Sequence, residues 1–255
     1  MTIIDAEVAI AAAEAGADVV RARFDRPGNR TLKLGIDFVT ETDLEAEEAI
    51  LDVVRTAYPD DAFLGEEAGL LGDAAAERTW LVDPLCGTLN FAARTPLVGV
   101  NVALRVGAEV VAAAVAEPFA DEVSWTDGTA AYLRRNGADT PLAPATTSSL
   151  VDVDLGGDPA WAAGLVVPLA DAGFRTMAVS TSLAATWVAS GRRAGYLIGG
   201  DMRDNVHFAA PVAVCRAAGC VVTTLDGRPL ESGAPGLLVA ADEETHQDLL
   251  AITGR

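Results

Sequence analysis

The sequence predicts a mixed α/β fold, with an α+β N-terminal half followed by an α/β C-terminal half. Two observations support this prediction. Short apolar runs separated by turn residues fill residues 98–133, a pattern typical of strands joined by hairpins. From residue 150 onwards, strand-like runs alternate with helical stretches. Such alternation indicates helices layered on the faces of a sheet.

The N-terminal region is expected to contain two helices joined through a short strand. Residues 5–23 have the apolar spacing of an amphipathic helix. Thr42 and Glu45 have the spacing of a capping box, so a second helix is expected to begin there with Asp43 in its first turn. On spacing alone, Asp43 is better explained as an acid that suits the helix dipole than as a ligand.

The stretch Trp80-Leu-Val-Asp-Pro-Leu-Cys-Gly-Thr-Leu-Asn-Phe91 concentrates groups that can bind ions. An apolar strand leads to Asp83, and Pro84 is expected to end it because proline cannot donate to a strand ladder. Gly87 and Thr88 then suit a tight turn that opens a helix, whose free amides favour an anion. An ordinary strand-to-turn stop explains the Asp-Pro pair equally well.

The remainder of the chain is expected to alternate strands and helices around one linker. Residues 136–149 are rich in Pro, Ala, Thr and Ser, so the domain boundary is placed there, with subdomains over residues 1–140 and 141–255. His246 is expected on an exposed surface of the last helix. The expected strands are 63–65, 98–106, 110–115, 123–125, 130–133, 150–155, 175–179, 196–198, 221–225 and 237–240, and the expected helices are 159–172, 183–190, 208–218 and 242–252.

Composition limits the partners. The formal charge of −19 argues against nucleic acid or an anionic membrane, because the field of the protein would repel a polyphosphate. A small phosphate ester stays compatible where a cation or helix end reverses the local sign. The three cysteines are too few for a disulfide framework, and neither a signal peptide nor a membrane span is visible. A cytoplasmic protein is expected.

Three motifs resemble those of the inositol monophosphatase family, a branch of the lithium-sensitive, magnesium-dependent phosphatase superfamily. Asp37-Phe-Val-Thr-Glu-Thr-Asp43 resembles the first motif, and Gly65-Glu66-Glu67 resembles the glycine-acid-acid motif. Residues 80–91 match the signature W-x-V-D-P-[LI]-D-G-T-x-N-F at all but one position. The resemblance spans nearly the whole chain. It implies an αβαβα layered sandwich, commonly a homodimer, that acts on a small-molecule substrate.

The resemblance also implies roles for individual residues. Family members bind magnesium ions between carboxylates, and these ions hold the phosphate and activate a water. Glu66, Asp83 and the Leu85 carbonyl match ligands of the first ion, and such oxygen ligands suit a hard cation. Thr88 with Asp43 matches the pair that orients the attacking water. The residues that match phosphate or substrate contacts are Gly87, Thr88, Ser180, Thr181 and Asp201.

Two departures fall at the second ion's site. Cys86 stands where the signature has its second acid, and His207 stands where the C-terminal motif has its acid. Asp201 or Asp204 replaces the missing acid only if the register shifts, which the Ala209-Ala210 pair opposes. Loss of an ion removes a Lewis-acid term of several kcal/mol, so ordinary magnesium-dependent turnover is expected to suffer. Cys86 and His207 are instead competent zinc ligands.

Three hypotheses therefore compete. The first is an enzyme repurposed from magnesium-dependent hydrolysis, in which Cys86, His207, Asp83 and Glu66 carry the chemistry, with a thiolate or acid–base couple and no metal. The second is a phosphatase of a sugar, cyclitol or nucleotide phosphate that retains one magnesium or uses zinc. The third is a non-catalytic homologue that keeps the pocket for binding. The simplest alternative is that Cys86 packs as a small hydrophobe and His207 is an ordinary hydrogen-bonded histidine.

Overall fold

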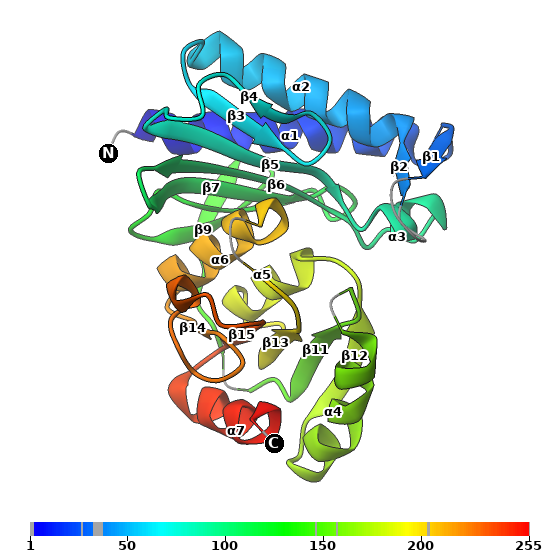
Figure 1. Cartoon of the computed structure of the whole chain (residues 1–255), viewed down its shortest axis with the longest axis vertical. Coiled ribbons are helices and arrows are strands. Elements are labelled where there is room, and N and C mark those ends of the chain that lie inside the picture. Colours follow the sequence, from blue (N-terminus) through cyan, green and yellow to red (C-terminus); the bar gives the residue numbers. More distant parts are fainter. Residues whose placement is uncertain are drawn as a thin grey trace.

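The computed structural model describes residues 3–26, 28–32, 38–145, 147–156, 158–202 and 205–254. Its elements form five layers that alternate helices and sheets, which confirms the expected layered α/β fold (Figure 1). One helix pair covers the first sheet, a second pair lies between the sheets, and a third covers the second sheet. In that order the pairs are α1 (Ile3–Arg23) with α2 (Glu41–Ala57), α5 (Leu183–Ala189) with α6 (Val206–Ala218), and α4 (Pro159–Asp171) with α7 (Glu243–Thr253).

The first sheet has eight strands in the order β10-β9-β8-β7-β6-β5-β3-β4. All neighbours are antiparallel except β3 and β5, which run parallel. The expected hairpin around Gly107 is confirmed as the β6–β7 connection. The strands are β3 (Ala62–Gly65), β4 (Gly69–Leu71), β5 (Arg78–Cys86), β6 (Gly99–Val106), β7 (Glu109–Glu117), β8 (Glu122–Thr126), β9 (Ala131–Arg135) and β10 (Ala138–Pro141).

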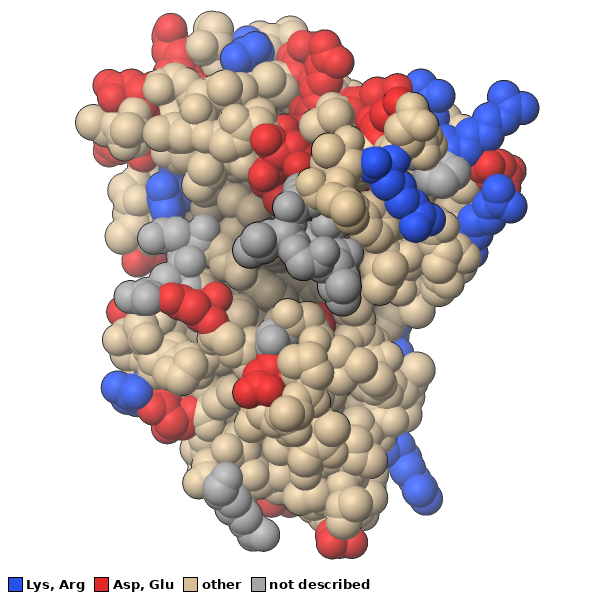
Figure 2. All heavy atoms as spheres, turned by 45° about the vertical axis from the view of Figure 1, so that its right-hand side comes forward, with Lys and Arg blue, Asp and Glu red and all other residues tan. Residues whose placement is uncertain are grey.

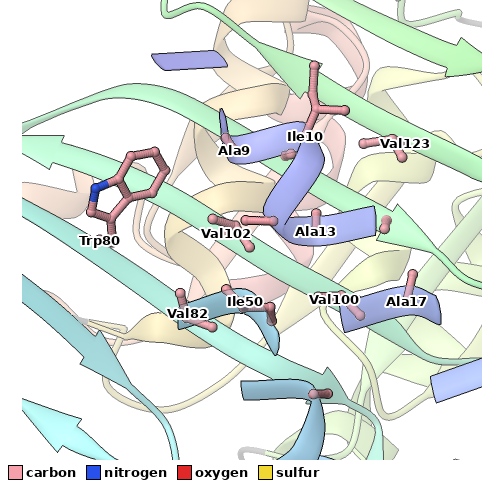
Figure 3. Close-up of a cluster of buried hydrophobic side chains, with 14 of the residues drawn as sticks. Ala9, Ile10, Ala13, Ala17, Ile50, Trp80, Val82, Val100, Val102 and Val123 are labelled. Carbon is pink, nitrogen blue, oxygen red and sulfur yellow. The ribbon is translucent and has the colours of Figure 1, made fainter. Parts of the chain in front are cut away.

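Small side chains let α1 approach this sheet closely (Figure 3). Ala9, Ala13 and Ala17 are buried against Val82 of β5 and Val100 of β6. Burial of apolar surface contributes about 25 cal/mol per Å², so this layer is a main source of stability. It holds the central strand β5 in place, and β5 carries Asp83 and Cys86.

The expectation that the strand ends at Pro84 is wrong. β5 continues to Cys86, and the pairing with β6 shifts register between Asp83 and Cys86. A bulge of this kind leaves an unpaired residue, so the missing proline N–H costs no ladder bond. Gly87 follows with φ +100°, a conformation that favours glycine. It opens the short helix α3 (Thr88–Ala92), which confirms the expected turn.

The start of α2 differs from the expected capping box by two residues. Thr40 is the N-cap and Asp43 is the N3 residue that returns a hydrogen bond to the Thr40 N–H at 2.9 Å. Thr42 and Glu45 therefore lie inside the helix, while Asp43 does lie in the first turn as expected. A two-stranded sheet, β1 (Arg30–Leu32) and β2 (Phe38–Thr40), precedes the helix. Asp37 lies outside the described residues.

The second sheet has five strands in the order β12-β11-β13-β15-β14. The predicted linker is only partly irregular, because β10 occupies residues 138–141 and pairs with β9 as an edge strand. The chain passes from the first sheet to the second within residues 142–149. The subdomain boundary between residues 140 and 141 remains a prediction. The strands are β11 (Leu150–Asp154), β12 (Arg175–Val179), β13 (Gly195–Ile198), β14 (Val221–Thr223) and β15 (Leu237–Ala240).

His246 is not exposed as expected. It lies on the buried face of α7 with a side-chain exposure of 5%, and its Nε2 lies 2.9 Å from the Thr223 hydroxyl. The apolar positions Leu249 and Ile252 share that face, because they follow at helical spacing and pack on the second sheet. His246 is therefore part of the packing between α7 and β14, remote from the predicted site.

The surface shows the acidic excess that the composition implies. In Figure 2, Asp and Glu are scattered over the face, while a group of Lys and Arg lies on its upper right and others lie singly along its edges. Among the described helices, none is both long and apolar enough to cross a membrane. The absence of a nucleic-acid partner and a cytoplasmic location remain predictions.

Asp152 makes the stability of the second sheet depend on pH. It is fully buried in β11, where burial raises its pKa to about 6 although the Arg193 guanidinium lies 2.7 Å away. An exposed aspartate titrates near 4, so between these values the folded chain keeps a proton that the unfolded chain releases. The stability from this proton is therefore lost as the pH rises through about 6.

Asp152→Asn removes this titration and provides the reference. We expect the free energy of unfolding of the parent chain, minus that of the variant, to fall by on the order of 1–2 kcal/mol between about pH 4.5 and about pH 7.5. Urea unfolding at a series of pH values measures the difference. A difference that stays constant or grows with pH would contradict this assignment.

Candidate functional site

The predicted site residues meet at a cavity of about 460 Å³ between the two sheets. It lies where the end of β5 leads into α3, beside the first turns of α5 and α6. Asp43 and Asp83 are fully buried and lie behind its wall. The other predicted residues all line it, namely Glu66, Leu85, Cys86, Gly87, Thr88, Ser180, Thr181, Asp201 and His207.

Asp83 and His207 form a direct pair. His207 Nδ1 lies 2.6 Å from Asp83 Oδ2 and 3.9 Å from Glu66 Oε2. The other carboxylate oxygen of Asp83 accepts a hydrogen bond from the Leu85 N–H at 3.1 Å. Asn205 is the N-cap of α6 and accepts from the His207 N–H, which fixes the backbone from which the ring extends. The imidazole therefore lies against both acids that the resemblance assigns to the first ion.

Cys86 completes a cluster of three potential ligands. Its sulfur, a ring nitrogen of His207 and a carboxylate oxygen of Asp83 all lie within 4.8 Å of one another. The sulfur also accepts two hydrogen bonds from Ser182, one from the N–H at 3.1 Å and one from the hydroxyl at 3.0 Å. The thiol and the ring face one another in the same pocket wall. Cys86 is thus more than a packed hydrophobe in this arrangement.

Asp83 and His207 shift each other's pKa. Burial opposes a charged ring at His207, but the Asp83 carboxylate outweighs burial and raises the pKa of His207 to about 12. Burial likewise opposes ionisation of Asp83, yet His207 holds the pKa of that carboxyl below its usual value. Burial and then the charge of Asp83 raise the pKa of the Cys86 thiol. These directions describe an ion pair beside a neutral thiol, and they do not favour a thiolate generated by His207.

Asp43 and Thr88 form a second pair, in which Thr88 lines the cavity and Asp43 is buried behind it. The Thr88 hydroxyl donates to Asp43 Oδ1 at 3.0 Å and lies 3.2 Å from the Leu85 carbonyl oxygen. Burial raises the pKa of Asp43, while its other oxygen caps α2 through Thr40. The cap locks the carboxylate in place, so Thr88, which lines the cavity, has a rigid partner for its hydroxyl.

Glu47 holds the loop that carries Glu66, and spacing gave no indication of this role. Its carboxylate accepts hydrogen bonds from the N–H groups of Glu67 at 3.0 Å and Ala68 at 2.7 Å. Glu47 lies one helical turn after Asp43 in α2 and is buried. One face of α2 therefore supports both the Asp43–Thr88 pair and the acidic loop.

Gly65 leaves no room for a side chain beside Glu47. A Cβ at this position would lie 2.1 Å from Glu47 Oε1 and 2.9 Å from Phe63 Cε1. We expect Gly65→Ala to reduce the free energy of unfolding by about 2–3 kcal/mol, because overpacking displaces a buried carboxylate from two amide partners. Denaturant unfolding measures the loss.

Gly164→Ala is the matched control for this substitution. Gly164 lies inside α4, and a Cβ there meets no described atom within 4 Å. Alanine in a helix interior is favoured over glycine by about 0.5–1 kcal/mol, so the control is expected to be neutral or stabilising. Equal effects at the two positions would show that Gly65 is not packed against Glu47 as described.

The atoms available as metal ligands decide which metal ion fits this site. Magnesium prefers octahedral oxygen coordination, and Glu66, Asp83 and the Leu85 carbonyl offer such oxygens at the first position. The second position offers a thiol and an imidazole, and the ring already contacts Asp83. That set does not fit a second magnesium ion. Asp, Cys and His together are suitable zinc ligands.

Several residues that shape the site were not predicted. Asn101 of β6 and Ser182 at the start of α5 contact the Asp83–Cys86 segment, and Asp154 lines the cavity while accepting from the Tyr196 hydroxyl at 2.8 Å. The one signal for Asn101 in the sequence was a polar asparagine within a mainly apolar run. Asp204, considered as a substitute acid, lies outside the described residues.

Comparisons with known proteins agree with the fold. The model of the inositol monophosphatase family matches residues 4–254. An inositol-1-monophosphatase of Caulobacter vibrioides is 31% identical over 84% of this chain and 86% of its own length. The chloroplastic phosphatase IMPL1 of Arabidopsis thaliana is 39% identical over 52% of this chain and only 36% of its own length. The structure of SuhB from Bartonella henselae superposes with a TM-score of 0.87 at 21% identity, covering 98% of both chains.

Proposed function

Because this chain belongs to the inositol monophosphatase family, we propose that it is an enzyme on that phosphatase scaffold with an altered catalytic centre. Its substrate is a small phosphorylated metabolite, and the Asp83–His207 pair stands in place of a second magnesium ion. The observation that supports this proposal is the 2.6 Å contact between His207 Nδ1 and Asp83 Oδ2. A carboxylate oxygen engaged by an imidazole is not free to bind a hard cation.

The cavity suits such a substrate. Its volume of about 460 Å³ lies within the range of about 300–1,000 Å³ that small-molecule sites occupy. We place the phosphate at the Gly87–Thr88 turn, because backbone N–H groups begin a helix there. Ser180, Thr181 and Asp201 line the same cavity and offer hydrogen-bonding groups to the remainder of the metabolite.

The residues divide the chemistry between two sides of the bound phosphate. Asp43 and Thr88 form the side that orients an attacking hydroxyl or water. His207 and Cys86 form the other side, with Glu66 beside the ring. A magnesium ion at the first position would be held by Glu66 and the Leu85 carbonyl, and by Asp83 only where that carboxylate leaves the His207 ring, so we expect it to bind weakly. When bound, it would supply charge stabilisation to the phosphoryl oxygens.

Phosphate release from a panel of small monoesters tests the proposal, with chelator, magnesium, manganese and zinc compared. We expect turnover to change by less than about tenfold, which corresponds to about 1.4 kcal/mol, between chelator and millimolar magnesium, because the His207 ring occupies the Asp83 carboxylate that a magnesium ion would need. Thr88→Val tests whether the turnover arises in this cavity. We expect it to lower turnover by about a hundredfold, because the attacking group is no longer oriented. Saturable activation by magnesium of a hundredfold or more would contradict the proposal.

A second candidate is a zinc-dependent phosphatase. The observation that favours it is the cluster of Asp83, Cys86 and His207 within 4.8 Å. Zinc-activated release that disappears in Cys86→Ala would support this candidate over the first. If no monoester is turned over under any condition, the third hypothesis of a non-catalytic pocket is tested by the rise in melting temperature that phosphorylated ligands produce. The homodimer that the resemblance implies also remains a prediction.

A further inference from the structure

Asn101 makes an unusual set of contacts at the centre of the molecule. It lies on β6 directly opposite Asp83 of β5, and it is fully buried. Its side-chain nitrogen lies 2.9 Å from the Ser182 hydroxyl, 3.3 Å from Asp83 Oδ2 and 3.2 Å from the His207 carbonyl oxygen. One amide nitrogen therefore reaches a strand, the start of α5 and the first turn of α6.

The donor count explains how these contacts are shared. An asparagine nitrogen carries two hydrogens, and three acceptors surround it here. The shortest contact takes one hydrogen to the Ser182 hydroxyl. The second hydrogen lies between the Asp83 carboxylate and the His207 carbonyl, whose distances from the nitrogen are nearly equal. Asn101 thereby ties the Asp83 side chain to the backbone of the residue with which Asp83 pairs.

The contact with Ser182 also sets the direction of the hydrogen bond between Ser182 and Cys86. Because the Ser182 hydroxyl accepts from Asn101, its own hydrogen is available to donate, and it donates to the Cys86 sulfur at 3.0 Å. The Ser182 N–H donates to the same sulfur. Cys86 is therefore held as an acceptor on its Ser182 side, and any thiol hydrogen is directed away from Ser182, toward the remaining partners of the cluster.

The other end of the Asn101 amide argues that the residue is present for its donor group. Among the described residues, no partner reaches the buried Asn101 Oδ1. A buried acceptor without a partner costs free energy, and an apolar side chain of the same shape would avoid that cost. The oxygen therefore gives no reason for asparagine in this mainly apolar stretch of β6, and the reason lies in the three contacts of the nitrogen.

We infer that Asn101 is the positioning residue of the site, whose single amide nitrogen holds Asp83, Ser182 and the His207 backbone in one arrangement. It acts through these three groups and contacts no substrate. Its effect on turnover rests on the proposed function, since a chain without turnover has no rate to lose. Its effect on the geometry of His207 does not depend on turnover.

The histidine content of the chain permits a direct test. The sequence has two histidines, one in the site and one, His246, buried beside Thr223 on α7. Nitrogen-15 labelling of histidine therefore gives two sets of ring signals by NMR, one from each imidazole. The His207 set reports the Asp83 pair, and the His246 set serves as an internal reference. We expect Asn101→Leu to change the His207 ring signals and leave those of His246 in place.

Three further variants make the result specific. Ser182→Ala removes one of the three contacts and should retain the His207 ring signals, because the contacts to Asp83 and the His207 carbonyl remain. Thr126→Val removes a buried hydroxyl bond elsewhere in the sheet and should change neither ring. Asn101→Ser keeps one donor on a smaller side chain. It is expected to shift the His207 signals less than the leucine variant, and it serves as the test variant if the leucine variant does not fold.

Turnover provides the second readout. We expect Asn101→Leu to lower kcat for monoester turnover by about a hundredfold with KM little changed, because displaced catalytic groups slow the step without removing substrate contacts. Asn101→Ser should recover part of the rate. The inference is overturned if the His207 ring signals are the same in Asn101→Leu or Asn101→Ser as in the parent chain. If the parent chain has no turnover but the Asn101 variants change the His207 ring signals as described, the proposed function fails and the positioning role stands.

Discussion

Replacing Cys86 and His207 with aspartate together should raise magnesium-dependent phosphatase activity well above that of the parent chain. The change restores two hard anionic oxygens to a pocket that already has Glu66, Asp83 and the Leu85 carbonyl. It also removes the imidazole that lies 2.6 Å from Asp83. A Lewis-acid contribution of several kcal/mol corresponds to about a hundredfold to a thousandfold in rate. Phosphate release from small monoesters in millimolar magnesium measures the gain.

The single substitutions and the folding stability serve as controls. Cys86→Asp alone leaves His207 on Asp83, and His207→Asp alone leaves a thiol in the ligand set, so each should recover much less than the double variant. Without metal, the double variant gathers four carboxylates in one pocket and should unfold more easily. Magnesium should then raise its melting temperature far more than that of the parent chain. A double variant that binds magnesium but gains no rate would show that the altered ligands are not what limits catalysis.

Asp83→Asn should cost about 3–5 kcal/mol of unfolding free energy, the largest stability loss that we expect in this chain. Asp83 is fully buried and is the partner of His207, the Leu85 N–H and Asn101. An asparagine there places an NH₂ donor against the imidazole ring or against the Leu85 N–H, where the parent chain has a carboxylate oxygen. Removing one partner of a buried ion pair leaves the other charge without compensation, which is the source of such large effects.

A double-mutant cycle separates the pair from the rest of the site. His207→Gln removes the charged ring, so adding Asp83→Asn to it should cost less than the same change in the parent chain, by about 1–3 kcal/mol. Urea unfolding of the four chains gives this coupling energy. Additive losses would mean that Asp83 and His207 do not interact in solution as they do in the structure.

The order of elements followed from the sequence because most of them have clear local signals. Apolar runs bounded by Gly and Pro marked nearly every strand from β5 to β15, and helical spacing marked the helices. The exact ends depended on tertiary pairing. Pro84 is a strand-breaking residue, yet β5 continues through it because the bulge between Asp83 and Cys86 accommodates a missing N–H. Thr40 caps α2 in place of Thr42 because the preceding strand β2 sets where the helix begins.

The site was predictable only as far as its motifs extended. Cys86 and His207 could be aligned with the family's acids, and the structure brings both to Asp83. The supporting contacts come from residues distant in sequence. Asn101 and Ser182 meet only because β6 lies beside β5 while α5 packs from the other sheet. His246 was misjudged for the same reason, since burial of α7 depends on the second sheet and not on the spacing of the helix alone.

Crystals grown with manganese test the central claim most directly, because manganese is a hard cation like magnesium and its anomalous scattering identifies it. The account predicts no manganese between Asp83, Cys86 and His207, with the ring nitrogen still within hydrogen-bond distance of the Asp83 carboxylate. A manganese ion bound to Asp83 at this position, with the His207 ring turned away, would contradict it.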